Sequence, residues 1–145
     1  MTREEMDRTA KAYAEAKNRH DPATALGHCT DDFFLEAVPL GSKTEGKRAV
    51  LDFLLDFFRA FPDYAGEIET KAFGDDVVIA TWNWRGTLRG EFLGYAPTGR
   101  PISLTAVSLY RFRDGKLAGE QVFFDLATLF RQAGLPLAIE VAQVA

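Results

Sequence analysis

The chain has 145 residues, which suits one domain with a real core, and we expect a single domain over residues 1–145. A net charge of −4 with dispersed basic residues argues against nucleic-acid or anionic-membrane partners. No apolar run approaches the ~20 residues of a membrane span, no signal-peptide pattern opens the chain, and the lone Cys29 excludes an intrachain disulfide. We therefore expect a cytoplasmic protein in which Cys29 is a buried, inert thiol.

Helices dominate the first part of the chain. Thr2 and Glu5 have capping-box spacing, and the Asp21-Pro22 pair is typical of an N-cap followed by the first helical residue. A broad apolar face at helical spacing indicates that the third helix is largely buried. The predicted elements are helices over about 2–19 and 21–27, a strand over 33–38 and a helix over 46–60.

Strands dominate the second part. Asp75-Asp76 and Asp114-Gly115 are typical of tight hairpin turns. Helices followed by antiparallel strands indicate an α+β fold, with a curved antiparallel sheet wrapped around the N-terminal helices. The predicted elements are strands over about 64–72, 77–88, 102–113 and 116–124, then a helix over 125–133.

The segment Val77–Arg100 gives the first sign of a binding function. Period-2 alternation puts Trp82 and Trp84 on one face of a strand, and three glycines follow in quick succession. Two tryptophans on a bent sheet wall a large apolar space. We therefore expect a pocket here, and a hairpin turn at Pro97–Arg100.

Several segments together resemble the SnoaL-like polyketide cyclases, a branch of the nuclear transport factor 2-like superfamily that includes ketosteroid isomerase. They cover most of the chain in the family's order. The segments are Phe61–Asp63, Trp82–Gly90, Gly94–Arg100, Tyr110–Lys116 and Asp125–Gly134.

The resemblance implies a cone-shaped α+β barrel with an apolar pocket for a small hydrophobic molecule. It also implies a homodimer formed through the outer face of the sheet. The polyketide cyclases of this family close a ring by intramolecular aldol chemistry, with acid/base residues and neither a metal nor an organic cofactor. Because fold alone does not carry function, the site residues have to be considered one at a time.

Tyr13 matches the tyrosine with which ketosteroid isomerase stabilises an enolate, although a tyrosine at the edge of the core is equally compatible with the pattern. The two acidic partners of that tyrosine are absent. Their positions fall near Ala37 or Val38 and at Ser108, so the isomerase mechanism is not expected. Ser108 still offers a hydrogen-bond donor.

The last predicted strand carries the candidate acid/base groups. Gln121, Phe123 and Asp125 share one face, and Glu120 lies on the other. The resemblance implies that Asp125 is the catalytic proton carrier, with Glu120 as the alternative. An Asp at this position is also the default N-cap of the following helix.

Metal chemistry and part of the acid/base chemistry lack their usual residues. His20 and His28 lack the spacing of metal ligands, so no metal site is expected. Leu88 stands where many relatives have a histidine.

Three functions follow from these patterns. The first is an enzyme that cyclises or isomerises a small hydrophobic carbonyl compound without a cofactor. In it Asp125 is catalytic and the pocket is formed by Tyr13, Trp82, Trp84, Ser108, Gln121 and Phe123. The second is a binding module that performs no chemistry, and the third is a dimerising domain whose cone is filled by its own phenylalanines.

Overall fold

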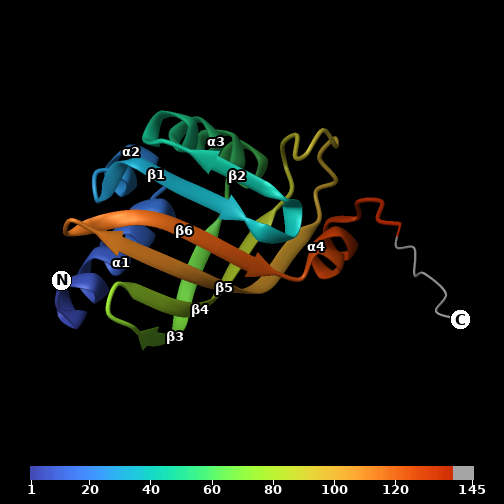
Figure 1. The fold of residues 1–145 in the computed structure, drawn as a ribbon. Helices are drawn as coiled ribbons and strands as arrows, with labels where there is room; N and C mark the ends of the chain where they lie inside the picture. The colour runs from blue at the N-terminus through green and yellow to red at the C-terminus, as the bar shows by residue number, and fades with distance from the viewer. Residues whose placement is uncertain (139–145) are drawn as a thin grey trace, which may run out of the picture.

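The computed structural model describes residues 1–138 as one curved six-stranded sheet with helices packed on its concave side (Figure 1). The strand order is β2-β1-β6-β5-β4-β3, and the sheet stays open between its two edge strands. The elements are α1 Arg3–Asn18, α2 Pro22–Leu26, β1 Cys29–Ala37, the 3₁₀ turn η1 Val38–Leu40, β2 Ser42–Glu45, α3 Lys47–Ala60, β3 Ala65–Phe73, β4 Val77–Thr87, β5 Pro101–Arg113, β6 Lys116–Phe124 and α4 Leu126–Ala133.

The helix starts follow from local capping. The Thr2 hydroxyl accepts a hydrogen bond from the Glu5 amide, and the Glu5 carboxylate accepts one from the Thr2 amide, so the capping box is confirmed. Asp21 caps α2 through the Thr24 amide. Helix α3 buries Val50 and its neighbours against β1 and β2, as its broad apolar face predicts.

The sheet is mixed rather than wholly antiparallel. Strand β1 runs parallel to β6, with Leu35 opposite Glu120, while the other four pairings are antiparallel. The expectation of an antiparallel sheet is therefore wrong for this one pair. Register shifts in three of the pairings interrupt the ladders, and such bulges bend a sheet.

The connection between β4 and β5, residues 88–100, packs against the C-terminal end of α3, where the amides of Arg89 and Gly90 donate to the carbonyl of Ala60. Its tight turn lies at Leu93-Gly94, both at positive φ, where Phe92 and Tyr95 pair. The hairpin turn predicted at Pro97–Arg100 is thus displaced toward the N-terminus. That segment is instead held in place by Thr98, whose hydroxyl donates to the carbonyl of Ala133.

The core lies between the concave face of the sheet and helices α1 and α3. Alternate residues of β4 and β5 point into it, among them Trp82, Trp84 and Ser108. No helix within residues 1–138 is long and apolar enough to cross a membrane.

Candidate functional site

An apolar cavity of about 90 Å³, which we call the inner cavity, lies between the concave face of the sheet and α3. Both tryptophans predicted to wall a pocket lie on it, and among residues 1–138 Lys17 is the one charged residue in its lining. The lining comprises Lys17, Leu35, Ala37, Leu40, Phe53, Leu54, Phe57, Tyr64, Trp82, Trp84, Phe92, Val122, Phe124 and Leu129.

A second, larger space adjoins the inner cavity. This outer groove, of about 390 Å³, lies between α3 and the 88–100 connection. Phe53, Phe57 and Phe92 line both spaces, so these rings form the boundary between them. The remaining lining of the groove is mostly charged: Asp56, Arg59 and Glu91, with exposed Leu93.

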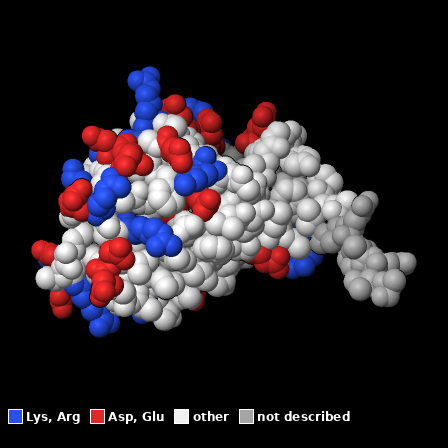
Figure 2. Space-filling view, viewed as in Figure 1, with Lys and Arg blue, Asp and Glu red and all other residues white. Residues whose placement is uncertain are grey.

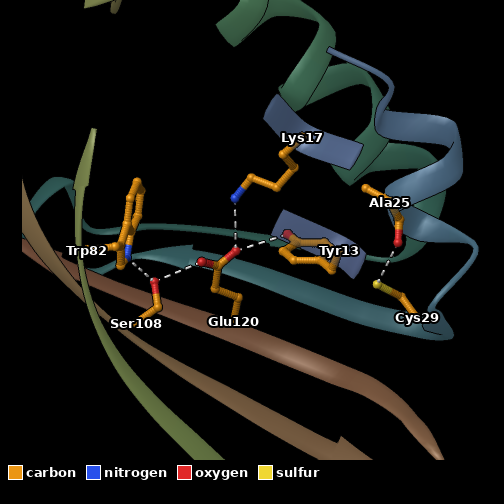
Figure 3. A network of polar contacts seen from close by, with 7 residues as sticks. All are labelled: Tyr13, Lys17, Ala25, Cys29, Trp82, Ser108 and Glu120. Carbon is orange, nitrogen blue, oxygen red and sulfur yellow. Dashed lines mark hydrogen bonds and ion pairs between the residues drawn. The ribbon is translucent and has the colours of Figure 1, made fainter. Parts of the chain in front are cut away.

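A buried carboxylate anchors a polar network beside the inner cavity (Figure 3). Glu120 is completely buried. Its Oε1 accepts a hydrogen bond of 2.9 Å from the Tyr13 hydroxyl and one of 3.3 Å from Lys17 Nζ. Its Oε2 accepts one of 2.8 Å from the Ser108 hydroxyl, which itself accepts 2.8 Å from Trp82 Nε1.

Four elements bring this network together. Tyr13 and Lys17 stand four residues apart on the buried face of α1, so they reach the same point on the sheet. Ser108 on β5 pairs with Val122 on β6, which is two residues from Glu120. On its other side Ser108 pairs with Ala80 on β4, which is two residues from Trp82. The register of three strands therefore sets the distance between the carboxylate and Trp82.

The surroundings of Glu120 shift the pKa values of its neighbours. Burial, followed by the charge of Glu120, holds the pKa of Tyr13 well above its usual range. Burial is the largest single influence on Lys17 and favours a lower pKa, but the charge and hydrogen bond of Glu120 together with the charge of Tyr64 outweigh it, and the net shift is upward. Tyr13 is therefore neutral and Lys17 cationic at neutral pH.

Cys29 lies beyond Tyr13, at the end of this network opposite Trp82 (Figure 3). Its thiol is buried and donates to the carbonyl of Ala25, the last contact drawn in Figure 3. Burial, with a smaller contribution from Glu120, raises the pKa of this thiol to about 12. Such a thiol carries almost no thiolate at neutral pH and is a poor nucleophile.

The structure brings some of the predicted site residues together and separates others. Tyr13 and Ser108 meet at Glu120, and the tryptophans line the inner cavity. Gln121 instead faces outward, between Glu36 and Arg111. Phe123 is also on the outer face, 39% exposed. Neither Gln121 nor Phe123 lines the inner cavity, because the residues of β6 that point inward are the alternate ones, Glu120, Val122 and Phe124.

Asp125 is exposed and caps α4 through the amides of Ala127 and Thr128. Hydrogen bonds from Thr128 hold the pKa of its carboxyl below the usual range. This is the N-cap position that its sequence context also predicted, and Asp125 lines neither the inner cavity nor the outer groove.

Lys17 is the residue that sequence reasoning missed. It recurs on the same helical stripe as Met6, Ala10 and Tyr13, all of which are buried. A lysine at such a position requires a buried acidic partner, since lone charges are rarely taken out of water. The stripe therefore predicts a buried acidic partner, and the structure identifies that partner as Glu120.

Comparison with known proteins agrees with this architecture. A family model described as SnoaL-like polyketide cyclase matches residues 7–133. The chain belongs to this family. No curated protein matches the chain.

Solved structures of similar fold include other SnoaL-like proteins. IdmH of Streptomyces antibioticus, a proposed polyketide cyclase, is 25% identical, with a TM-score of 0.74 over 89% of this chain and 98% of that one. AclR of Streptomyces galilaeus, a proposed hydroxylase, is 22% identical, with a TM-score of 0.79 over 96% and 91%. A Catenulispora acidiphila protein of ketosteroid isomerase-like fold is 20% identical, with a TM-score of 0.76 over 88% and 93%.

In this SnoaL-like protein the structure locates a position at which ketosteroid isomerase has an acidic residue and this chain does not. Ala37 lines the inner cavity, so no acid stands at that wall. Within residues 1–138 no three His, Cys, Asp or Glu side chains gather as metal ligands would.

Proposed function

We propose that the protein is a cofactor-independent acid/base enzyme that cyclises or isomerises a small hydrophobic carbonyl compound in the inner cavity. The observation that carries the proposal is a fully buried carboxylate, Glu120, fixed by Tyr13, Ser108 and Lys17 beside an apolar cavity. Family membership supports the same class of chemistry.

Glu120 takes the role of proton carrier in this proposal, in place of Asp125. An ionised carboxylate offers about four acceptor positions, and Tyr13, Lys17 and Ser108 use three of them. Because the carboxylate is removed from water, little solvent competes for its remaining lone pair.

The reaction needs a base for the Cα proton and a donor at the carbonyl oxygen. The Cα proton passes to Glu120, and the electron pair of the broken C–H bond forms the enolate. For ring closure, the enolate carbon then attacks a second carbonyl of the same molecule. The oxygen of that carbonyl takes the proton back from Glu120, which restores the starting enzyme.

The ligand extends from the inner cavity toward the outer groove. A cavity of roughly 150 Å³ is known to hold benzene, so the 90 Å³ of the inner cavity is small for one complete ring. The phenylalanines shared with the outer groove are the boundary that the ligand crosses, Phe92 among them.

A second candidate is binding without chemistry. The observation that favours it is that Glu120 is already neutralised by Lys17 and does not itself line the inner cavity. In that case the protein holds the same class of ligand but does not deprotonate it.

Exchange of the methyl protons of acetophenone for deuterium, followed by ¹H NMR in D₂O, separates the two candidates. We expect the parent protein to accelerate exchange over buffer, Glu120→Gln to lose about 10²–10⁴-fold of that acceleration, and Asp125→Asn to stay within about twofold of the parent. Circular dichroism checks that both variants are folded.

One result would contradict the enzyme proposal, and another would contradict the assignment of Glu120 as its proton carrier. Binding of acetophenone without accelerated exchange leaves the non-catalytic candidate. Accelerated exchange that survives in Glu120→Gln but is lost in Asp125→Asn returns the role of proton carrier to Asp125.

A further inference from the structure

Lys17 has hydrogen-bonding capacity that the protein does not use. An ammonium group has three N–H donors, and within residues 1–138 the recorded acceptor is Glu120 Oε1, at 3.3 Å. The rest of its surroundings are aromatic, with Nζ 4.9 Å from the ring centroid of Tyr13 and 5.8 Å from that of Trp82. Two donors are therefore left without a protein acceptor.

Lys17 lies where the inner cavity meets a smaller space of about 20 Å³ beside Asn18 and Gly66, so these donors are within reach of the cavity. The side chain is 10% exposed and contributes to the lining, where it is the one charged group of the described part of the chain. In Figure 3 it lies on the side of Glu120 opposite the sheet, with Trp82 beside it. A ligand that fills the cavity meets the ammonium group before it meets the carboxylate.

We infer that Lys17 binds the carbonyl oxygen of the substrate and that the site selects a neutral, enolisable carbonyl compound over a carboxylate. The inference rests on the proposed function and names the substrate class for the same site. A ligand carboxylate would place a second anion beside Glu120 with one cation to share, in a site removed from water. A neutral carbonyl brings no such charge.

Charge conservation explains why the pair suits this chemistry. Before reaction the site holds Glu120 as an anion, Lys17 as a cation and a neutral ketone. When the Cα proton moves to Glu120, the carboxyl becomes neutral and the negative charge appears on the enolate oxygen. Lys17 then stabilises the enolate in place of the carboxylate, so the net charge of the buried site never changes.

Covalent catalysis by Lys17 does not fit this geometry. A Schiff base requires the neutral amine, whereas the contact with Glu120 favours the ammonium form. The pKa of Lys17 lies above its usual value for the same reason, although burial acts in the opposite direction. Lys17 is thus a hydrogen-bond donor to the substrate.

The test compares two ligands of nearly the same shape. Acetophenone and α-methylstyrene differ in that a C=O group replaces C=CH₂, and their binding is measured by titration of tryptophan fluorescence. The measured quantity is the affinity for acetophenone divided by the affinity for α-methylstyrene. We expect this ratio to be about tenfold higher in the parent than in Lys17→Met. Lys11→Met, a variant at an exposed lysine of the same helix, keeps the parent ratio.

Folding of the variant needs its own control, because Lys17→Met alone leaves Glu120 buried without a cation. The Lys17→Met/Glu120→Gln double variant removes both charges, and its affinity ratio is compared with that of Glu120→Gln. An equal ratio in these two proteins overturns the inference. So does benzoate binding to the parent more tightly than acetophenone.

The two proposals fail separately. A Lys17-dependent preference for the ketone without deuterium exchange supports the binding inference and contradicts the enzyme proposal. Deuterium exchange that depends on Glu120, with no effect of Lys17→Met on the affinity ratio, supports the enzyme proposal and contradicts the binding inference.

Discussion

Ser108 links the wall of the inner cavity to the buried carboxylate. Its hydroxyl accepts a hydrogen bond from Trp82 and donates one to Glu120, and the residue is completely buried. Substitution by alanine leaves an indole N–H without an acceptor and a carboxylate oxygen without a donor. We expect Ser108→Ala to lower the free energy of unfolding by about 1–3 kcal/mol in urea titrations.

Ser103 supplies the matched control on the same strand. It is exposed, and its hydroxyl takes part in one long contact of 3.4 Å with Asn83. Ser103→Ala should change the free energy of unfolding by no more than about 0.5 kcal/mol. Equal effects of the two substitutions would mean that the Ser108 hydroxyl contributes nothing specific to the network.

The sequence defines the residues of the site only in part. Alternation separates Glu120 from Gln121, Phe123 and Asp125, but it does not say which face of the strand is inward. That choice depends on the pairing of β6 with β1 and β5, which is a tertiary property. The family resemblance favoured Asp125, and the structure brings Glu120 to the interior instead.

The helices and strands could be predicted from the sequence more completely than the site. The bounds of α1, α3 and the strands β3 to β6 lie within one or two residues of their predictions, because apolar periodicity or flanking turn residues mark each of them. Strand β2 has the sequence Ser-Lys-Thr-Glu, which lacks any apolar alternation, and it was not predicted. Strand β1 begins at Cys29 rather than at Phe33, since its first residues precede the apolar run.

Gly90 fixes where the 88–100 connection leaves the core. Its amide donates to the carbonyl of Ala60, and a Cβ atom there would lie 2.5 Å from the carbonyl oxygen of Arg59. The obstacle is helix backbone, which cannot move aside as a flexible side chain does. We expect Gly90→Ala to lower the free energy of unfolding by about 1–3 kcal/mol, measured as a shift in the urea midpoint.

Arg89 is the neighbouring control for this substitution. Its side chain is exposed, so Arg89→Ala shortens a residue of the same loop without adding an atom near α3. A change within about 0.5 kcal/mol is expected for it. If Gly90→Ala proves equally mild, the contact between the loop and α3 is loose enough to absorb a methyl group.

At the scale of the whole molecule, none of the helices within residues 1–138 covers the outer face of the sheet. The helices occupy the concave side, and Val107, Leu109 and two further apolar residues of β4 to β6 point outward. In Figure 2 the charged side chains gather toward the end that carries the N-terminus, and most of the surface between there and α4 is uncharged. A contiguous apolar patch on a sheet face is typical of an interface.

We propose that two copies of the chain pair through this outer face about a two-fold axis, so that the same patch of each copy meets its counterpart. Phe123, opposite Val107, and Ile79, opposite Leu109, are each 39% exposed and form the centre of the patch. Sedimentation velocity should show the parent with the mass of two chains and Phe123→Lys with the mass of one, because a charge in the centre of an apolar interface lacks a partner. Leu55 on α3 is also 39% exposed but lies away from the sheet face, so Leu55→Lys should remain a dimer. A monomeric parent, or a dimer that dissociates with Leu55→Lys and survives Phe123→Lys, would exclude the outer face as the interface.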